Sequence, residues 1–224
     1  MTDQIEAIAP ETLAQLEALD ISRDRPLIAV DADEVLVIFV EHLSSWMATI
    51  GFEMRLERYE LEGSMFPEGS DDPLPFDECI GLINRFFKEQ TLEQQAVDGA
   101  ADALSRLAEV AQIVVLTNVP RLATETRRQN LHALGMPYPV VVNSGGKGRA
   151  MVWLCQQTDA PVGFIDDSVK QIESVARHAP DVVRVHFAWA DFIDRFYPEC
   201  SDASARVRSW EAAEKALRQG MALP

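Results

Sequence analysis

Residues 26–39, PLIAVDADEVLVIF, place two carboxylates between two apolar runs. Residues 27–30 have the composition of a buried strand, and residues 35–40 are again entirely apolar. The flanking runs therefore draw Asp31 and Asp33 towards the protein interior, where an unpaired carboxylate is costly. Partners that neutralise these two acids are expected elsewhere in the chain.

The order of apolar patterns along the chain predicts an α/β fold. Helical spacing dominates from about residue 39 to 95, after the first strand. Beyond it, helical segments alternate with four strand-like runs, QIVVLT, YPVVVN, PVGFIDD and VVRVHF. Short β-branched runs that alternate with helices are typical of a parallel sheet covered on both faces. We predict an open, Rossmann-like parallel sheet covered by helices on both faces, with a small helical cap inserted after its first strand.

The same pattern predicts two domains. Residues 1–38 and 98–224 form the α/β core domain, and residues 39–97 form the helical cap domain. Amphipathic helices are expected at about 10–19 and 202–218. The Gly/Pro/Asp-rich segment 61–77 is predicted to be a loop that exposes Met65 and Phe66.

Composition excludes several classes of protein. The 224 residues are 47% hydrophobic and 25% charged, as in ordinary soluble proteins. No apolar run reaches the roughly 18 residues of a membrane span, and a net charge of −16 speaks against a nucleic-acid partner. Three scattered cysteines and an N-terminus unlike a signal peptide predict a cytoplasmic protein. The sequence does not indicate an oligomeric state.

Polar residues follow each predicted strand, and in parallel sheets such positions meet at one edge. They are Asp31 and Asp33, then Thr117 and Asn118, then Ser144 with a Gly-rich loop and Lys147, then Asp166 and Asp167. Four carboxylates in one crevice require a cation, and oxygen ligands beside a phosphate favour Mg²⁺. The lysine and the loop glycines suit an anion. Together these residues predict a phosphoryl-transfer site.

The set resembles the haloacid dehalogenase superfamily. Members carry an apolar strand followed by DxDx(T/V), here DADEV at 31–35, and a strand ending in Thr or Ser, here VVLTN at 114–118. A lysine follows, here Lys147, and then an acidic pair, here within GFIDDS at 163–168. The resemblance covers about residues 25–190, and the insert resembles the mobile helical cap of that superfamily. It implies a phosphomonoester hydrolase acting on a small phosphorylated metabolite.

The resemblance also implies a role for each motif residue. Asp31 would be the nucleophile that forms an aspartyl-phosphate, and Asp33 the general acid and base. Thr117, Asn118 and Lys147 would hold the phosphoryl oxygens.

The same resemblance implies a magnesium site. Asp31, Asp166 and the backbone carbonyl of Asp33 would bind Mg²⁺, and Asp167 would do so directly or through water. Many relatives have glycine where this chain has Glu34, so substrate preference is left open.

Other interpretations of these motifs remain. Taken singly, Asp31 and Asp33 could cap a turn and a helix, and Thr117 could simply end a strand. Lys170, in the helix that follows the second acidic pair, is an alternative to Lys147 as the positive charge of the site. A two-component receiver domain uses similar residues, but there the acidic pair belongs to the first strand and the phosphoacceptor Asp to a later one. In this chain the order is reversed. A catalytically silent binding module would not need Asp33, and a haloacid-type dehalogenase needs no Mg²⁺ and typically lacks the second Asp of DxD. We expect the insert to select the substrate, with its basic residues either solvated or bound to a second anionic group of the substrate.

Overall fold

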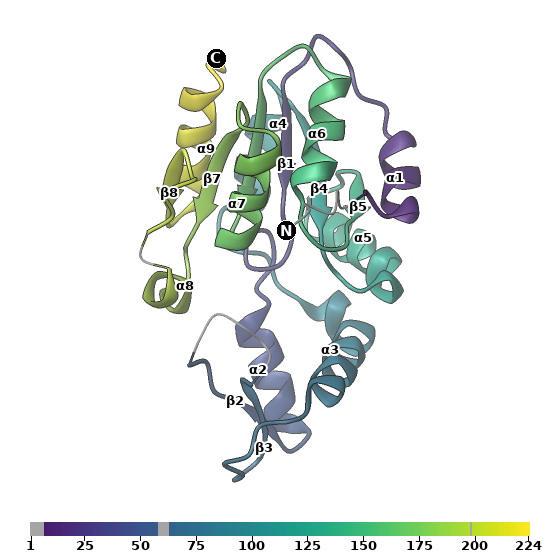
Figure 1. Ribbon diagram of the computed structural model, residues 1–224, viewed down its shortest axis with the longest axis vertical. Coiled ribbons are helices and arrows are strands. Elements are labelled where there is room, and N and C mark those ends of the chain that lie inside the picture. Colours follow the sequence, from purple (N-terminus) through teal and green to yellow (C-terminus); the bar gives the residue numbers. More distant parts are fainter. Residues whose placement is uncertain (1–6, 58–62, 198) are drawn as a thin grey trace, which may run out of the picture.

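The computed structural model describes residues 7–57, 63–197 and 199–224. Figure 1 shows a large α/β part above a smaller group formed by α2, β2, β3 and α3. The large part is built on a parallel sheet, as predicted, but the sheet has six strands where the sequence indicated five. Its strands are β1 (Leu27–Val30), β4 (Gln112–Thr117), β5 (Val140–Val142), β6 (Val162–Asp166), β7 (Val183–Phe187) and β8 (Ala205–Val207).

The strand order is β5-β4-β1-β6-β7-β8, so β1 lies in the interior of the sheet. Residue 30 of β1 pairs with residue 115 of β4 on one side and with residue 165 of β6 on the other. The chain moves outward from β1 to β4 and β5, and then returns to β6 on the other side. Ligands bind at such reversals of strand order, at the carboxyl ends of the strands.

Side chains of β1 alternate between two hydrophobic cores because successive residues of a strand point to opposite faces. Ile28 and Val30 pack with helices α4 (Ala100–Ala108), α5 (Thr124–Ala133) and α9 (Trp210–Gly220). Leu27 and Ala29 pack with α1 (Pro10–Glu17), α6 (Gly148–Gln157) and α7 (Val169–His178). Both faces are therefore covered, as a fully apolar parallel strand requires. Across the described ranges, every helix is too short or too polar to span a bilayer.

Residues 39–97, here called the insert, contain more than the predicted helices. Between α2 (Val40–Thr49) and α3 (Phe76–Gln90), β2 (Phe52–Met54) and β3 (Met65–Pro67) form an antiparallel ribbon. The two chain segments that join the insert to the sheet lie side by side. Ile38 N–H donates to Gln95 (2.9 Å), and Val97 N–H donates to Leu36 (2.9 Å).

Met65 and Phe66 are buried, so the prediction that they are exposed was wrong. They form most of β3 and are 0% and 8% exposed, and Met65 belongs to the hydrophobic cluster of the insert. The Arg55 guanidinium lies 4.4 Å from the centroid of the Phe66 ring. Glycines and prolines around this segment mark the turns at the ends of a short strand.

The predicted C-terminal helix also begins later than expected. Residues 205–207 form β8, which pairs in parallel with β7, and α9 follows as Trp210–Gly220. Ser209 caps that helix, because its side chain accepts a hydrogen bond from the Ala212 N–H. A three-residue edge strand gives too short an apolar pattern to be separated from the helix that follows.

Candidate active site

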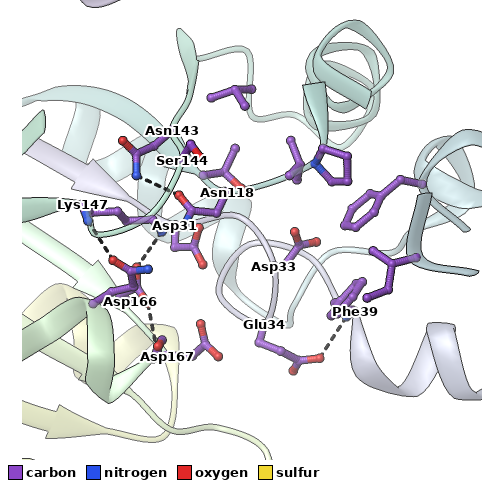
Figure 2. Close-up of a pocket in the computed structure, with 18 of the residues that line it drawn as sticks. Asp31, Asp33, Glu34, Phe39, Asn118, Asn143, Ser144, Lys147, Asp166 and Asp167 are labelled. Atoms are coloured by element: carbon purple, nitrogen blue, oxygen red, sulfur yellow. Dashed lines mark hydrogen bonds and ion pairs between the residues drawn. The ribbon is translucent and has the colours of Figure 1, made fainter. Parts of the chain in front are cut away.

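Polar side chains from four strand ends meet at one edge of the sheet (Figure 2). Asp31 follows β1, Thr117 ends β4, and Lys147 follows β5 at the start of α6. Asp166 ends β6, and Asp167 comes next. Because β1 lies between β4 and β6, all of these residues line one pocket of about 600 Å³.

Lys147 is the central positive charge of this pocket. Its Nζ lies 2.6 Å from Asp31 Oδ1 and 2.6 Å from Asp166 Oδ2, and its side chain is only 1% exposed. Burial acts to lower the pKa of Lys147, but the two carboxylates outweigh burial, so the pKa is raised. Lys147 therefore stays protonated. Lys170, the alternative considered from sequence, is exposed on α7.

The three carboxylates of Asp31, Asp166 and Asp167 crowd together around this lysine. Each offers an oxygen that lies within 4.8 Å of the others. Burial raises the pKa of Asp166 to about 7, against the attraction of Lys147 and with a further rise from Asp31. Burial also raises the pKa of Asp167, and the charges of Asp31 and Glu34 add to it. One lysine does not neutralise three carboxylates.

These residues fit a hard divalent cation. The carboxylates supply only oxygen ligands, which favour such ions over softer metals. Burial is the main cause of both raised pKa values, and a cation among the carboxylates would offset the repulsion from Asp31 that adds to it. Asp166 and Asp167 are also held in place, because Ser168 N–H donates to Asp166 Oδ1 (2.9 Å) and His186 Nε2 lies 2.9 Å from the Asp167 carbonyl oxygen.

The segments that follow β4 and β5 add hydrogen-bonding groups to the pocket. Thr117 is fully buried, and its hydroxyl has no hydrogen-bond partner in the described part of the chain. The side chain of Asn118, which was predicted to hold a phosphoryl oxygen, already has two partners. Its amide donates to the Gly145 carbonyl (2.9 Å), and its Oδ1 accepts from Asn143 (3.0 Å). Sequence reasoning missed Asn143, although it follows β5 directly. The Thr117 hydroxyl is thus a hydrogen-bonding group of the pocket lining that has no partner among the described residues.

The two glycines that flank Lys147 serve packing, whereas the predicted approach of this loop to an anion stays a prediction. A Cβ atom at Gly146 would lie 2.6 Å from Ser174 Oγ, and one at Gly148 would lie 2.3 Å from the Ser174 carbonyl. The backbone N–H groups of Lys147 and Gly148 donate to Gln171 and Ser174. The glycines therefore let α6 pack closely on α7, which fixes the position of Lys147.

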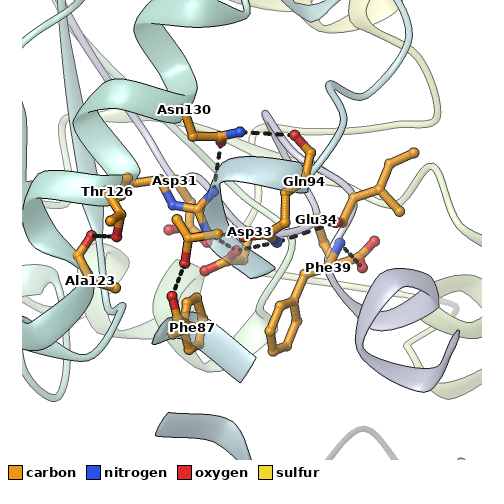
Figure 3. Close-up of polar contacts among 12 residues, drawn as sticks. Asp31, Asp33, Glu34, Phe39, Phe87, Gln94, Ala123, Thr126 and Asn130 are labelled. Atoms are coloured by element: carbon orange, nitrogen blue, oxygen red, sulfur yellow. Dashed lines mark hydrogen bonds and ion pairs between the residues drawn. The ribbon is translucent and has the colours of Figure 1, made fainter. Parts of the chain in front are cut away.

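Asp33 contacts a buried arginine that sequence reasoning missed. Figure 3 labels Asp33, Gln94 and Asn130, which are the partners of this arginine. Arg127 Nη2 donates to Asp33 Oδ1 (2.6 Å) and to Gln94 Oε1 (2.9 Å), while Nη1 donates to Asn130 Oδ1 (3.2 Å). The Arg127 side chain is 0% exposed. Burial raises the pKa of Asp33, and Arg127 opposes the rise. Arg127 and Arg128 are adjacent in the sequence, which gives no sign of which one is buried.

Glu34 connects the turn after β1 to the insert. Its Oε1 accepts the backbone N–H groups of Phe39 (3.0 Å) and Val40 (2.6 Å) at the start of α2, where a carboxylate is favourable. Its φ of +60° lies in the left-handed region that suits glycine. Burial raises the pKa of Glu34 to about 7. A glycine at this position would fit the backbone but would leave α2 without this cap.

Comparisons with known proteins place the fold. No family model and no curated protein matches the chain. Among solved structures, a HAD family hydrolase from Deinococcus radiodurans with bound phosphate and sodium has a TM-score of 0.57 at 17% identity, covering 91% of this chain and 99% of that one. The chain has the fold of the haloacid dehalogenase-like hydrolases.

Two further structures agree with this fold. CbbY from Rhodobacter sphaeroides in complex with phosphate has a TM-score of 0.56 at 18% identity, covering 88% of this chain and 99% of that one. The putative HAD-hydrolase YfnB from Bacillus subtilis, bound to magnesium, has a TM-score of 0.54 at 14% identity over the same shares. The fold predicted from the four motifs is therefore confirmed, whereas the roles of the site residues stay predictions.

The contact between Arg127 and Asp33 predicts unequal effects of two neighbouring substitutions. Arg127→Ala leaves buried polar groups without a partner, so the free energy of unfolding should fall by about 3–5 kcal/mol. Arg128→Ala is the matched control: this side chain is 45% exposed, and its ion pair with Glu125 is worth at most about 1 kcal/mol. Urea unfolding of both variants measures the difference. Equal losses would contradict the structural role given to Arg127.

The crowded carboxylates predict how stability depends on pH and metal. Without metal, the folded protein keeps the Asp166 proton up to a pKa of about 7, whereas the unfolded chain loses it near 3.8. The folded state then binds more protons, so stability falls as pH rises between these values. Because a divalent cation binds the ionised form, Mg²⁺ should raise the melting temperature more at about pH 8 than at about pH 5.

Thermal unfolding in chelator and in Mg²⁺ tests this dependence. Asp166→Asn should abolish the magnesium shift, whereas Asp102→Asn, at an exposed position on α4, should keep it. A magnesium shift of the same size at both pH values, or one that persists in Asp166→Asn, would rule out this cation site.

Proposed function

We propose that this protein is a Mg²⁺-dependent phosphomonoester hydrolase that acts on a small phosphorylated metabolite. The observation that carries the proposal is the convergence of Asp31, Lys147, Asp166 and the unpartnered Thr117 hydroxyl on one pocket. A nucleophilic carboxylate, a fixed ammonium and a hydroxyl donor suit a phosphoryl group, whose transfer depends mostly on positioning and charge.

Asp31 would attack the phosphorus atom and form an aspartyl-phosphate, while the ester oxygen departs. Lys147 and Thr117 would hold the phosphoryl oxygens during this step. Asp33 would give a proton to the departing oxygen and then take one from the water that hydrolyses the intermediate. Arg127 contacts Oδ1 of Asp33, so the second oxygen of that carboxylate remains for proton transfer.

Mg²⁺ would be held by Asp31, Asp166, Asp167 and the backbone carbonyl of Asp33, and when bound it would neutralise charge on the phosphoryl group. In this proposal residues 39–97 are a cap domain above the core of residues 1–38 and 98–224. The pairing of residues 36–38 with 95–97 would be its hinge.

Ligands bound in solved structures of this fold support the proposal. The Deinococcus hydrolase and CbbY hold phosphate, and YfnB holds magnesium. The retained acid Asp33 and the acidic pair at 166–167 favour a phosphatase over a dehalogenase or a silent binding module. A cytoplasmic location is part of the proposal, since the three cysteines form no disulfide.

Hydrolysis of an aryl phosphate in Mg²⁺ tests the proposed function. Asp31→Asn should lower turnover by at least about 10³-fold, because an amide is a poor nucleophile. The variant should stay folded, because Lys147 keeps Asp166 as its partner. Chelator should abolish wild-type turnover, and added Mg²⁺ should restore it. Asp98→Asn, at an exposed position outside the pocket, is the control and should keep full activity. Turnover that survives in Asp31→Asn would refute the assignment.

A further inference from the structure

The pocket has two chemically different ends. Asp31, Lys147 and Asp166 lie at the carboxyl ends of the strands, where the proposed function places the phosphoryl group. The remaining space is bounded by the insert and by the loops after β4 and β7. A substrate whose phosphorus sits at Asp31 would place its leaving group in that space, so the side chains there describe the leaving group.

One helix of the insert forms a wall of this space. Ile80, Ile83, Asn84 and Phe87 of α3 all line the pocket. Their spacing of three, four and seven residues puts them on one face of a helix. Ile80 is 41% exposed, whereas Phe87 is buried. Three of the four side chains on this wall are therefore apolar.

The facing walls are apolar as well. Phe39 and Val40 come from the start of α2, Leu56 follows β2, Val119 follows β4, and Phe192 lies on α8 (Asp191–Phe196). The Phe39 ring stacks against Phe87, with 5.5 Å between ring centroids and 16° between planes. Figure 2 shows Phe39 on the side of the pocket away from Lys147 and Asp166. The leaving group would thus meet aromatic and aliphatic surface on several sides.

Positive charge is scarce at this end of the pocket. Among the described residues that line the pocket, only Lys147 and Arg121 carry it. Lys147 is bound by its two carboxylates, and Arg121 forms an ion pair with Glu11 in which Nη1 lies 2.7 Å from Oε1. A second phosphate on the substrate would have to compete with Glu11 for that one guanidinium.

The basic residues of the insert considered from sequence do not supply another site. Arg55 contacts Glu53 and the Ser70 carbonyl, and Arg85 pairs with Glu89. Neither lines the pocket, nor does the exposed Lys88. Arg58 lies outside the described residues.

Asn84 carries the one side-chain amide on the α3 wall, and this side chain makes no hydrogen bond to any residue that the structure describes. It offers a partner for a single oxygen or hydroxyl of the leaving group. A sugar or polyol would bring several hydroxyls against apolar walls, and each unpaired hydroxyl costs binding free energy.

We propose that the natural leaving group is an apolar alcohol of about the size of an aromatic ring, with no second anionic group. This inference rests on the proposed function for the position of the phosphate. The pocket then binds the substrate by removing the apolar surface of the leaving group from water. Lys147 and a bound cation hold the phosphate, which is the only charged group of the substrate.

Hydrolysis of three alkyl phosphates tests the preference. Benzyl phosphate, glycerol phosphate and fructose bisphosphate all release alkoxides, so reactivity of the leaving group does not decide the order. We expect kcat/KM for benzyl phosphate to exceed that for either polyol ester by at least about 30-fold, the scale of discrimination by apolar pockets. Equal values, or a preference for a polyol ester, would overturn the inference.

Substitutions on α3 test whether this wall is responsible. Ile80→Gln and the double variant Ile80→Gln/Ile83→Gln should raise KM for benzyl phosphate, by about tenfold in the double variant, with little change in kcat. KM for methyl phosphate, which is too small to contact the wall, should not change. Leu92→Gln is the control, because Leu92 is 53% exposed but lies outside the pocket. The partly exposed Ile80 can be replaced alone if the double variant fails to fold.

Binding measurements separate this inference from the proposed function. Benzylphosphonate and 2,3-dihydroxypropylphosphonate resemble two of the esters but have no bond to hydrolyse. Calorimetry in Mg²⁺ should show that benzylphosphonate binds more tightly than 2,3-dihydroxypropylphosphonate. The affinity for benzylphosphonate should be lower in Ile80→Gln. If no ester is hydrolysed but this preference holds, the hydrolase assignment fails and the apolar pocket stands. If esters are hydrolysed without this preference, the apolar leaving group is wrong.

Discussion

The ammonium group of Lys147 lies 2.6 Å from a carboxylate oxygen of Asp31 and 2.6 Å from one of Asp166, in a position almost closed to solvent. A buried carboxylate or ammonium without its partner would be strongly destabilising. The parallel sheet supplies both acids from adjacent strands, and the packing of α6 on α7 brings the lysine between them. The proposed chemistry, the proposed cation site and the proposed substrate pocket all depend on this arrangement.

The fold and the centre of the site could be predicted from sequence because they follow from periodicity. Apolar runs alternating with helices predicted a parallel sheet, and a parallel sheet brings Asp31, Thr117, Lys147 and Asp166 to one edge. Burial of Arg127 could not be predicted, because it depends on contacts with Asp33 and Gln94, which are distant in the chain. Short edge strands such as β3 and β8 could not be predicted for a similar reason, because their pairing with other strands, rather than their own residues, defines them.

Asp33 and Glu34, which follow β1, contact the two ends of the insert. Glu34 accepts hydrogen bonds at the start of α2, where the chain enters the insert. Asp33 contacts Arg127, which also holds Gln94 near the point where the chain leaves it. The proposed acid and base is therefore part of the connection between insert and core, so movement of the insert would reposition the group that transfers the proton. The hydrogen bonds that Glu34 accepts at the start of α2 are a physical reason for a glutamate, rather than a glycine, at position 34.

In the proposed reaction, Asp31 becomes phosphorylated and Asp33 then activates the water that releases phosphate. Rapid-quench measurement of an aryl phosphate with the Asp33→Asn variant tests it most directly. Because an activated leaving group needs little protonation, the first step should survive while the second slows by about 10²–10⁴-fold. A burst near one equivalent is expected, with the phosphoryl group found on Asp31 by mass spectrometry after acid quench. Linear turnover with no phosphoenzyme would contradict it.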